Sequence, residues 1–113
     1  RIADAVVPLT SEVISELAHG TAAGEAARLV WEAAGRALAG NGAVMRCAPA
    51  ALRWRRSGRH LIEQTTASAL ITHYDPRCVW SAVAVNGTIA HCIAGAVIDL
   101  DWPGKRVRFG ARI

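Results

Sequence analysis

The sequence predicts an all-α fold, and three features of its 113 residues lead to that prediction. Hydrophobic residues make up 52% of the chain, enough apolar surface for folding to offset the entropy lost on ordering. Alanine is the commonest residue, and it favours closely packed helices because it is small and loses no side-chain entropy. Apolar residues mostly recur at helical spacing between glycines and prolines. We therefore expect a compact orthogonal helical bundle of about five helices in a single partial domain, residues 1–113.

Two helices are predicted in the first forty residues. Thr10 or Ser11 can cap the first helix, which we expect to end at His19-Gly20. Thr21 can cap the second helix, and its apolar stripe continues as far as Leu38.

Two shorter helices follow. Pro49 fits the first turn of a helix ending at residue 55, because proline loses no intrahelical hydrogen bond there. Ser57-Gly58 is a predicted turn, and residues 59–71 form the next predicted helix.

The last predicted helix has the strongest start signal. Asp75 suits the N-cap and Pro76 the first helical position, and apolar residues continue to about Gly95. Residues 97–113 alternate in polarity on either side of Pro103-Gly104. This pattern predicts either a short β-hairpin or an irregular C-terminal tail.

Charge and cysteine content restrict the classes of function. The formal net charge of +4 favours anionic partners, but clusters such as Arg53–Arg56 are more often solvated than bound to nucleic acid, so nucleic acid is an unlikely partner. The three cysteines form no CxxC pair, which argues against a zinc ribbon or a redox motif and fits a cytoplasmic protein. No run of about 18 apolar residues occurs, so we expect no membrane partner.

Two loops that precede helices are candidate binding elements. Gly40-Asn41-Gly42 can expose backbone N–H groups to an anion, and Arg46 adds a guanidinium with forked donors. His73, just ahead of a capped helix, can hydrogen-bond a ligand through a ring nitrogen. The alternative is two ordinary helix connections, with Arg46 in a surface ion pair and His73 partly exposed.

The two loops together resemble a known family. The runs GNGAVMRCAPAAL (40–52) and SALITHYDPRCVWSAVAV (68–85) are similar to the ADP-ribosylglycohydrolase family, which includes the dinitrogenase reductase-activating glycohydrolase. The resemblance covers residues 14–96 and leaves the tail, residues 97–113, unmatched. It implies an all-helical enzyme that removes ADP-ribose from a modified side chain or related acceptor with two divalent metal ions, Mg or Mn.

The resemblance also implies roles for particular residues. Gly40, Asn41 and Gly42 would form part of the wall that holds ADP-ribose, and His73 would contact the ligand. Arg46 would brace the first loop or face the pocket. The supporting residues would be Met45, packed beneath the loop, and Asp75, capping the next helix.

The metal ligands of the family have no counterpart here. The family has an early Thr-Asp-Asp segment and a late Asp-x-Asp-Thr segment, but Asp4 is isolated and Asp99-Leu100-Asp101 is followed by Trp102. Two ions would lack hard oxygen ligands, so we assign no catalytic and no metal-binding residue and expect no metal on this chain alone. We expect a fragment of a longer enzyme, with a degenerate relative or a split protein as alternatives.

Another interpretation is a non-catalytic helical module that binds a protein partner or an anionic ligand. Four tryptophans could serve as anchors, and a small domain buries a smaller fraction of its apolar surface. Self-association through an uncovered apolar face is therefore a further expectation, besides binding of an ADP-ribosylated protein or an ADP-ribose-like ligand.

Overall fold

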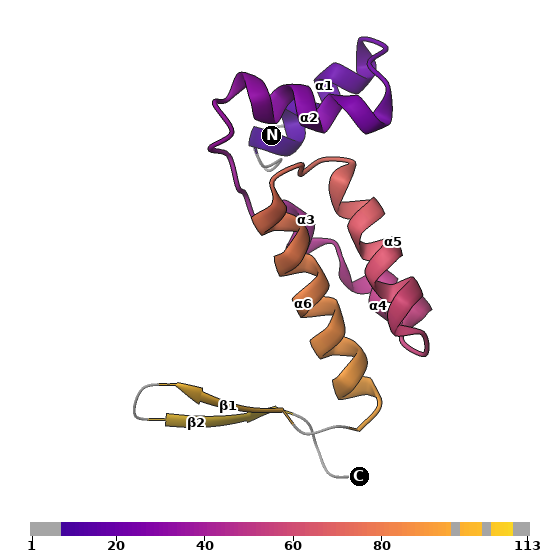
Figure 1. Ribbon diagram of the computed structural model, residues 1–113, viewed down its shortest axis with the longest axis vertical. Helices are drawn as coiled ribbons and strands as arrows, with labels where there is room; N and C mark the ends of the chain where they lie inside the picture. Colours follow the sequence, from indigo (N-terminus) through magenta and orange to yellow (C-terminus); the bar gives the residue numbers. More distant parts are fainter. Residues whose placement is uncertain (1–7, 96–97, 103–104, 110–113) are drawn as a thin grey trace, which may run out of the picture.

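The computed structural model describes residues 8–95, 98–102 and 105–109 (Figure 1). Within these residues, the helical part of the chain confirms the all-α prediction. The elements in chain order are the helices α1 (Pro8–Ala18), α2 (Ala23–Ala33), α3 (Gly42–Met45), α4 (Ala48–Trp54), α5 (Gly58–Leu70) and α6 (Pro76–Ile93), and the strands β1 (Ile98–Trp102) and β2 (Lys105–Phe109).

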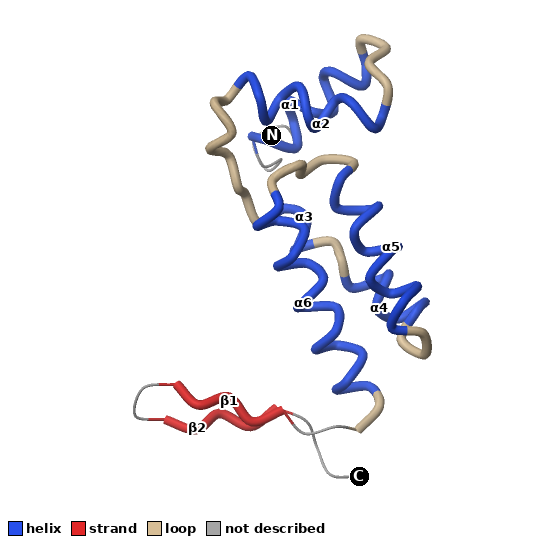
Figure 2. Tube along the Cα trace, in the orientation of Figure 1, coloured by secondary structure: helices blue, strands red, loops and turns tan. Residues whose placement is uncertain are grey.

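The helices form two groups, which Figure 2 shows in blue. Helices α1 and α2 pack side by side at one end of the molecule. Helix α6 is the centre of the second group and contacts α3, α4 and α5. The loop after α2 and the loop between α5 and α6 both lie where the two groups meet (Figure 1).

Small side chains dominate the core. One buried cluster lies between α1 and α2 and includes Leu9, Val13 and Val30. Two further clusters lie along α6 and consist mainly of alanine; their buried members are Ala43, Cys47, Ala69 and Ala82 in one, and Ala51, Leu61 and Ala90 in the other. Alanine at these contacts lets the helix backbones approach closely, which agrees with the composition.

A buried amide connects three elements of the second group. Asn86 on α6 is fully buried and donates hydrogen bonds to the Cys47 carbonyl (2.9 Å) and to the Thr65 hydroxyl (2.8 Å). Cys47 lies between α3 and α4, and Thr65 is on α5. Both bonds come from the Nδ2 atom of Asn86, and they join the three segments around α6.

The first two helices differ in detail from the prediction. Helix α1 begins at Pro8, earlier than the expected caps at Thr10 or Ser11. Thr21 does not cap α2; its hydroxyl donates to Glu16 instead, and the N-cap residue is Ala22. The second helix ends at Ala33 and not near Leu38, because Gly35 and Arg36 both adopt positive φ angles, which stop a right-handed helix.

The later helix boundaries agree more closely. Pro49 lies in the first turn of α4, and Asp75 caps α6 with Pro76 directly after it, as predicted. Ser57 is the N-cap of α5 and accepts a hydrogen bond from the backbone of His60. The expected loop at residues 40–46 is partly helical, because Gly42–Met45 form the single turn α3.

Strands β1 and β2 pair antiparallel, with Ile98 opposite Phe109 and Trp102 opposite Lys105. Of the two expected forms of the tail, the hairpin is therefore the observed one. The predicted turn at Pro103-Gly104 lies outside the described residues. None of the helices in the described ranges combines the length and apolar content needed to cross a bilayer.

Candidate functional site

The two candidate loops meet at a contact between His73 and Gly42. The His73 side chain has 0% exposure, and a Cβ atom at Gly42 would lie only 2.8 Å from its Cε1 and 3.0 Å from its Nε2. The same Cβ would lie 3.2 Å from the Thr10 hydroxyl of α1. Glycine is thus required at position 42 by close packing against His73.

A chain of hydrogen bonds fixes the His73 ring. Arg46 donates to the Ser68 hydroxyl (2.9 Å), the Ser68 carbonyl (2.7 Å) and the Thr72 hydroxyl (2.6 Å). The Thr72 hydroxyl is in turn 2.7 Å from His73 Nδ1. With Thr72 donating to Nδ1, the neutral ring carries its hydrogen on Nε2, an atom that has no hydrogen-bond partner in the described part of the chain. Arg46 therefore braces the second loop.

Burial and the positive charge of Arg46 both change the pKa of the His73 ring. Burial is the larger effect, and together they lower the pKa of His73 below its ordinary value of 6.5. The ring is therefore neutral at physiological pH, in keeping with its tight packing against Gly42.

Asp75 connects the second loop to both helix groups. Its carboxylate accepts from the Arg77 backbone N–H (2.9 Å), from Arg77 Nε (3.0 Å) and Nη2 (2.9 Å), and from Trp31 Nε1 on α2 (3.0 Å). These bonds, those from the Arg77 side chain first, hold the pKa of Asp75 well below its usual value of 3.8. Asp75 thus supports the loop as expected, and it also attaches α2 to the start of α6.

A small, mainly apolar hollow opens beside the first loop. It has a volume of about 130 Å³ and lies between that loop and the first two turns of α6. Asn41, Arg77 and Ser81 are exposed there, and the Arg77 side chain is 67% exposed. The lining residues are Ala39, Gly40, Asn41, Val44, Arg77, Cys78 and Ser81.

The hollow has a fixed floor. Cys78 on α6 donates a hydrogen bond from its thiol to the Gly40 carbonyl (3.3 Å), so the loop is held directly to the helix. Beside this floor lie the Arg77 guanidinium, which is paired with Asp75, the exposed Asn41 amide and the Ser81 hydroxyl, and together they can contact one phosphate-sized anionic group.

The structure brings the two loops together, but only the first loop contributes residues to the lining of the hollow. Asn41 and Gly40 line the hollow, whereas His73 lies buried behind Gly42 and does not line it. His73 was expected to contact the ligand, but the close packing of the loops covers its ring. Met45 was expected beneath the first loop but is 69% exposed, because Gly42 and Ala43 form the buried side of the single turn α3.

Sequence reasoning missed Arg77 and Ser81. The signal was present, because both follow Asp75 within the first two turns of α6 and are four residues apart, on one face of the helix. Spacing of this kind places both side chains beside any loop that packs against the start of α6.

A model of the ADP-ribosylglycohydrolase family matches residues 4–108. The chain belongs to the ADP-ribosylglycohydrolase family. The match contains both loops and also includes most of the residues after 96, beyond the segment expected from the motifs. Neither a curated protein nor a solved structure gave a match.

ADP-ribosylglycohydrolases are generally metal-dependent. Over the described ranges no three His, Cys, Asp or Glu side chains come together in a group that could hold a metal ion. Asp75, the carboxylate beside the hollow, already accepts four hydrogen bonds from protein donors. These residues do not fit a two-metal centre, and no catalytic step through a metal is derived from them.

The lowered pKa of His73 predicts a pH-dependent stability. Below the ordinary pKa of 6.5 the unfolded chain binds a proton on this ring more readily than the folded chain does. The stabilisation is therefore fully present above 6.5 and is lost as the pH falls through the lower folded-state pKa. We expect the free energy of unfolding, measured with urea from about pH 8 to pH 5, to fall more steeply for the wild type than for His73→Gln. Parallel curves would contradict this, since the other three histidines are common to both proteins.

Proposed function

We propose that this ADP-ribosylglycohydrolase-family chain binds the ADP-ribose group of a modified protein, or of a related compound, at the hollow beside Gly40 and Asn41. The observation that carries the proposal is the convergence of Asn41, Arg77 and Ser81 on one hollow within the family-matched segment. ADP-ribose contains a pyrophosphate, which favours a cation and polar hydrogen-bond donors at its binding site.

Arg77 and Asn41 keep polar groups available to a ligand, and the Ser81 hydroxyl, which donates to the Arg77 carbonyl (2.6 Å), can still accept a hydrogen bond. Arg77 uses Nε and Nη2 to hold Asp75, so its Nη1 atom faces no carboxylate in the described residues. The Asn41 side chain is exposed and does not cap α3, so its amide can both donate and accept. A volume of about 130 Å³ suits one phosphate group, and the rest of the ligand would extend over the neighbouring surface.

His73 and Arg46 then act as positioning residues. His73 fills the space behind Gly42, and Arg46 anchors the loop that carries His73 to the end of α5. Rigid support of this kind keeps the exposed groups in a fixed geometry.

The binding role is separate from hydrolysis. In the parent enzyme, divalent Mg or Mn would activate the attacking water, and the described residues do not supply their ligands. We therefore propose that this chain contributes ADP-ribose-binding residues to a glycohydrolase whose metal ligands lie in other segments.

Removing the Asn41 amide tests the proposed binding site. Asn41→Ala should weaken binding of ADP-ribose about 5- to 10-fold, the usual effect of losing one hydrogen-bonding partner, as measured by calorimetry. Gln64→Ala is the matched control, because Gln64 is an exposed amide on α5 that does not line the hollow. Equal affinities for wild type and Asn41→Ala would contradict this site.

The same purified chain tests whether ADP-ribose binding occurs without hydrolysis. With added Mg or Mn, the chain should release no ADP-ribose from an ADP-ribosylated protein while still binding free ADP-ribose. Metal-dependent release by the purified chain would overturn the separation of the two roles.

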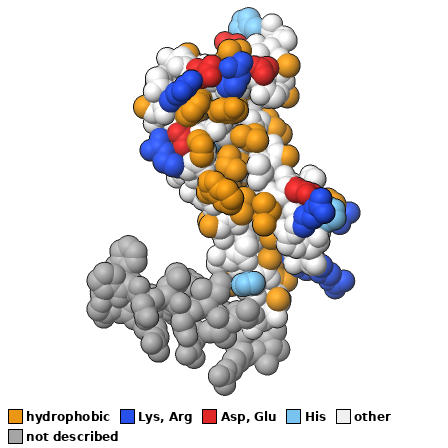
Figure 3. All heavy atoms as spheres, in the orientation of Figure 1, with side chains coloured by type: hydrophobic (Ala, Val, Ile, Leu, Met, Phe, Trp, Pro, Cys, Tyr) orange, Lys and Arg blue, Asp and Glu red, His pale blue; other side chains and the backbone are white. Residues whose placement is uncertain are grey.

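A second candidate function is a helical module that binds a protein, including a second copy of the chain. Several large hydrophobic side chains are exposed, Met45 at 69% and Trp80 at 68% among them. Figure 3 shows hydrophobic side chains gathered along one face of the helical part. Exposed apolar residues of this size are typical of protein contact surfaces.

Self-association through these residues has a direct test. Light scattering should show a mass above that of the monomer, decreasing towards it on dilution, and Trp80→Gln should shift the equilibrium towards monomer. Ser81→Gln is the matched control, because it places the same side chain at the next exposed position of α6. A concentration-independent monomer for the wild type would rule out self-association.

A further inference from the structure

A groove distinct from the candidate site runs between α5 and α6. Two cavities of about 360 Å³ and 320 Å³ share Arg55, Arg56 and Ala90 in their walls, so they are parts of the same groove. A third cavity of about 330 Å³ shares the two arginines and lies on their other side. Arg55 and Arg56 are thus the common feature of all three.

The floor of the groove is apolar. Leu61 and Ile62 come from α5, and Val83, Gly87 and Ala90 come from α6. The lining residues of α6 extend from Val83 to Ala94, about 16 Å along the helix axis at 1.5 Å per residue. Beyond the neighbouring backbone of α6, no atom of the described residues lies within 4 Å of a Cβ built at Gly87, so the groove is open at its middle.

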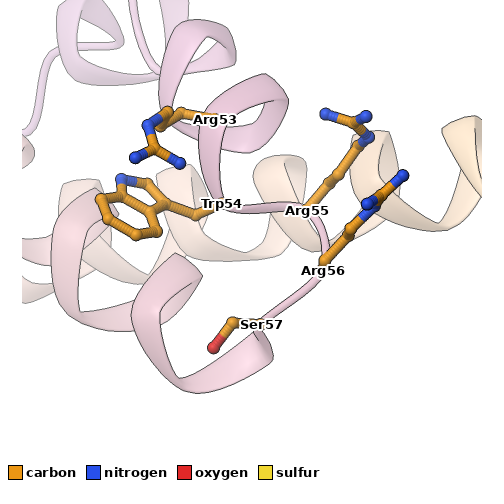
Figure 4. A pocket seen from close by; sticks show the side chains of 5 residues that line it. All are labelled: Arg53, Trp54, Arg55, Arg56 and Ser57. Atoms are coloured by element: carbon orange, nitrogen blue, oxygen red, sulfur yellow. The ribbon is translucent and has the colours of Figure 1, made fainter.

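The end of the groove is cationic. Figure 4 shows the side chains of Arg55 and Arg56 pointing the same way, away from the Trp54 indole. Arg53 is separate, since its guanidinium lies over the Trp54 ring at 4.4 Å. Among the residues that the structure describes, no carboxylate lines these three cavities, and Glu63 on α5 is paired with Arg59 (2.9 Å).

Arg55 donates one hydrogen bond to the Leu52 carbonyl (2.7 Å), and its remaining donors and those of Arg56 give this end of the groove a positive charge that favours a bound anion. The apolar floor favours an uncharged hydrocarbon group in the same ligand. Cavities of this size are typical of small-ligand sites, which favours a small molecule over a protein segment.

We propose that the α5–α6 groove binds an anionic amphiphile. Its hydrocarbon tail lies over Leu61, Ile62 and Gly87, and its phosphate or carboxylate head group lies between Arg55 and Arg56. This binding is independent of the ADP-ribose hollow, whose lining residues are all different.

The test uses decyl phosphate below its micelle concentration, titrated into the 113-residue chain by calorimetry. The double variant Arg55→Gln/Arg56→Gln should lose about tenfold or more in affinity, because two charge-assisted contacts are removed. Gly87→Leu should lower the affinity to a similar extent by filling the groove. Both variants should stay folded, since each change is at a solvent-accessible position.

Matched controls separate the groove from general effects. Arg59→Gln removes the same charge nearby, and Gly24→Leu makes the same change at an open helical glycine of α2. Both should bind decyl phosphate like the wild type. The proposal is overturned if the wild type does not bind, if inorganic phosphate binds equally well, or if Gly87→Leu and Gly24→Leu have equal affinities.

A second experiment, with lipid vesicles, distinguishes a membrane lipid from a soluble amphiphile as the natural ligand. Phosphatidylcholine vesicles with added phosphatidic acid are compared with the monomeric probe, using the same variants. Vesicle binding with the same dependence on Arg55, Arg56 and Gly87 supports a membrane lipid as the ligand. Binding of the monomeric probe alone supports a soluble acyl or alkyl anion.

Discussion

The contact between His73 and Gly42 joins the two candidate loops of this chain, and the arrangement around the hollow depends on it. The ring is fully buried, and a side chain at position 42 would overlap it. Because His73 is held by Thr72 and Arg46, the position of the first loop is set by hydrogen bonds that begin on α5. Asp75 completes the connection by holding α2 through Trp31. The exposed groups of Asn41 and Arg77 therefore lie on a rigid support.

Local chemistry made part of this structure predictable. Asp75 and Pro76 begin α6 because the carboxylate satisfies a free backbone N–H and proline needs no hydrogen bond in the first turn. The all-α fold followed from alanine content and helical spacing. Some helix ends were not predictable from the sequence. Thr21 donates to Glu16 instead of capping α2. Gly35 and Arg36 end α2 five residues before its apolar stripe ends.

The sequence predicted which two loops form the candidate site, but not which of their residues line the hollow. Their motifs indicated that Gly40-Asn41-Gly42 and His73 belong together, and the structure places them in contact. Whether a histidine faces solvent or packs behind a glycine depends on the approach of two segments that are about 30 residues apart, which sequence spacing does not encode. The spacing that puts Arg77 and Ser81 on one face of α6 is visible in the sequence, but the loop that packs beside them is not.

The position of the first loop depends on the packing of His73 against Gly42, and a double-mutant cycle tests that packing most directly. The free energy of unfolding is measured for the wild type, Gly42→Ala, His73→Ala and the double variant. Gly42→Ala should destabilise the wild type by about 1–3 kcal/mol through overpacking, and should cost much less when His73 is already alanine. Additive effects, agreeing within about 0.5 kcal/mol, would show that the two residues do not interact and would contradict the account.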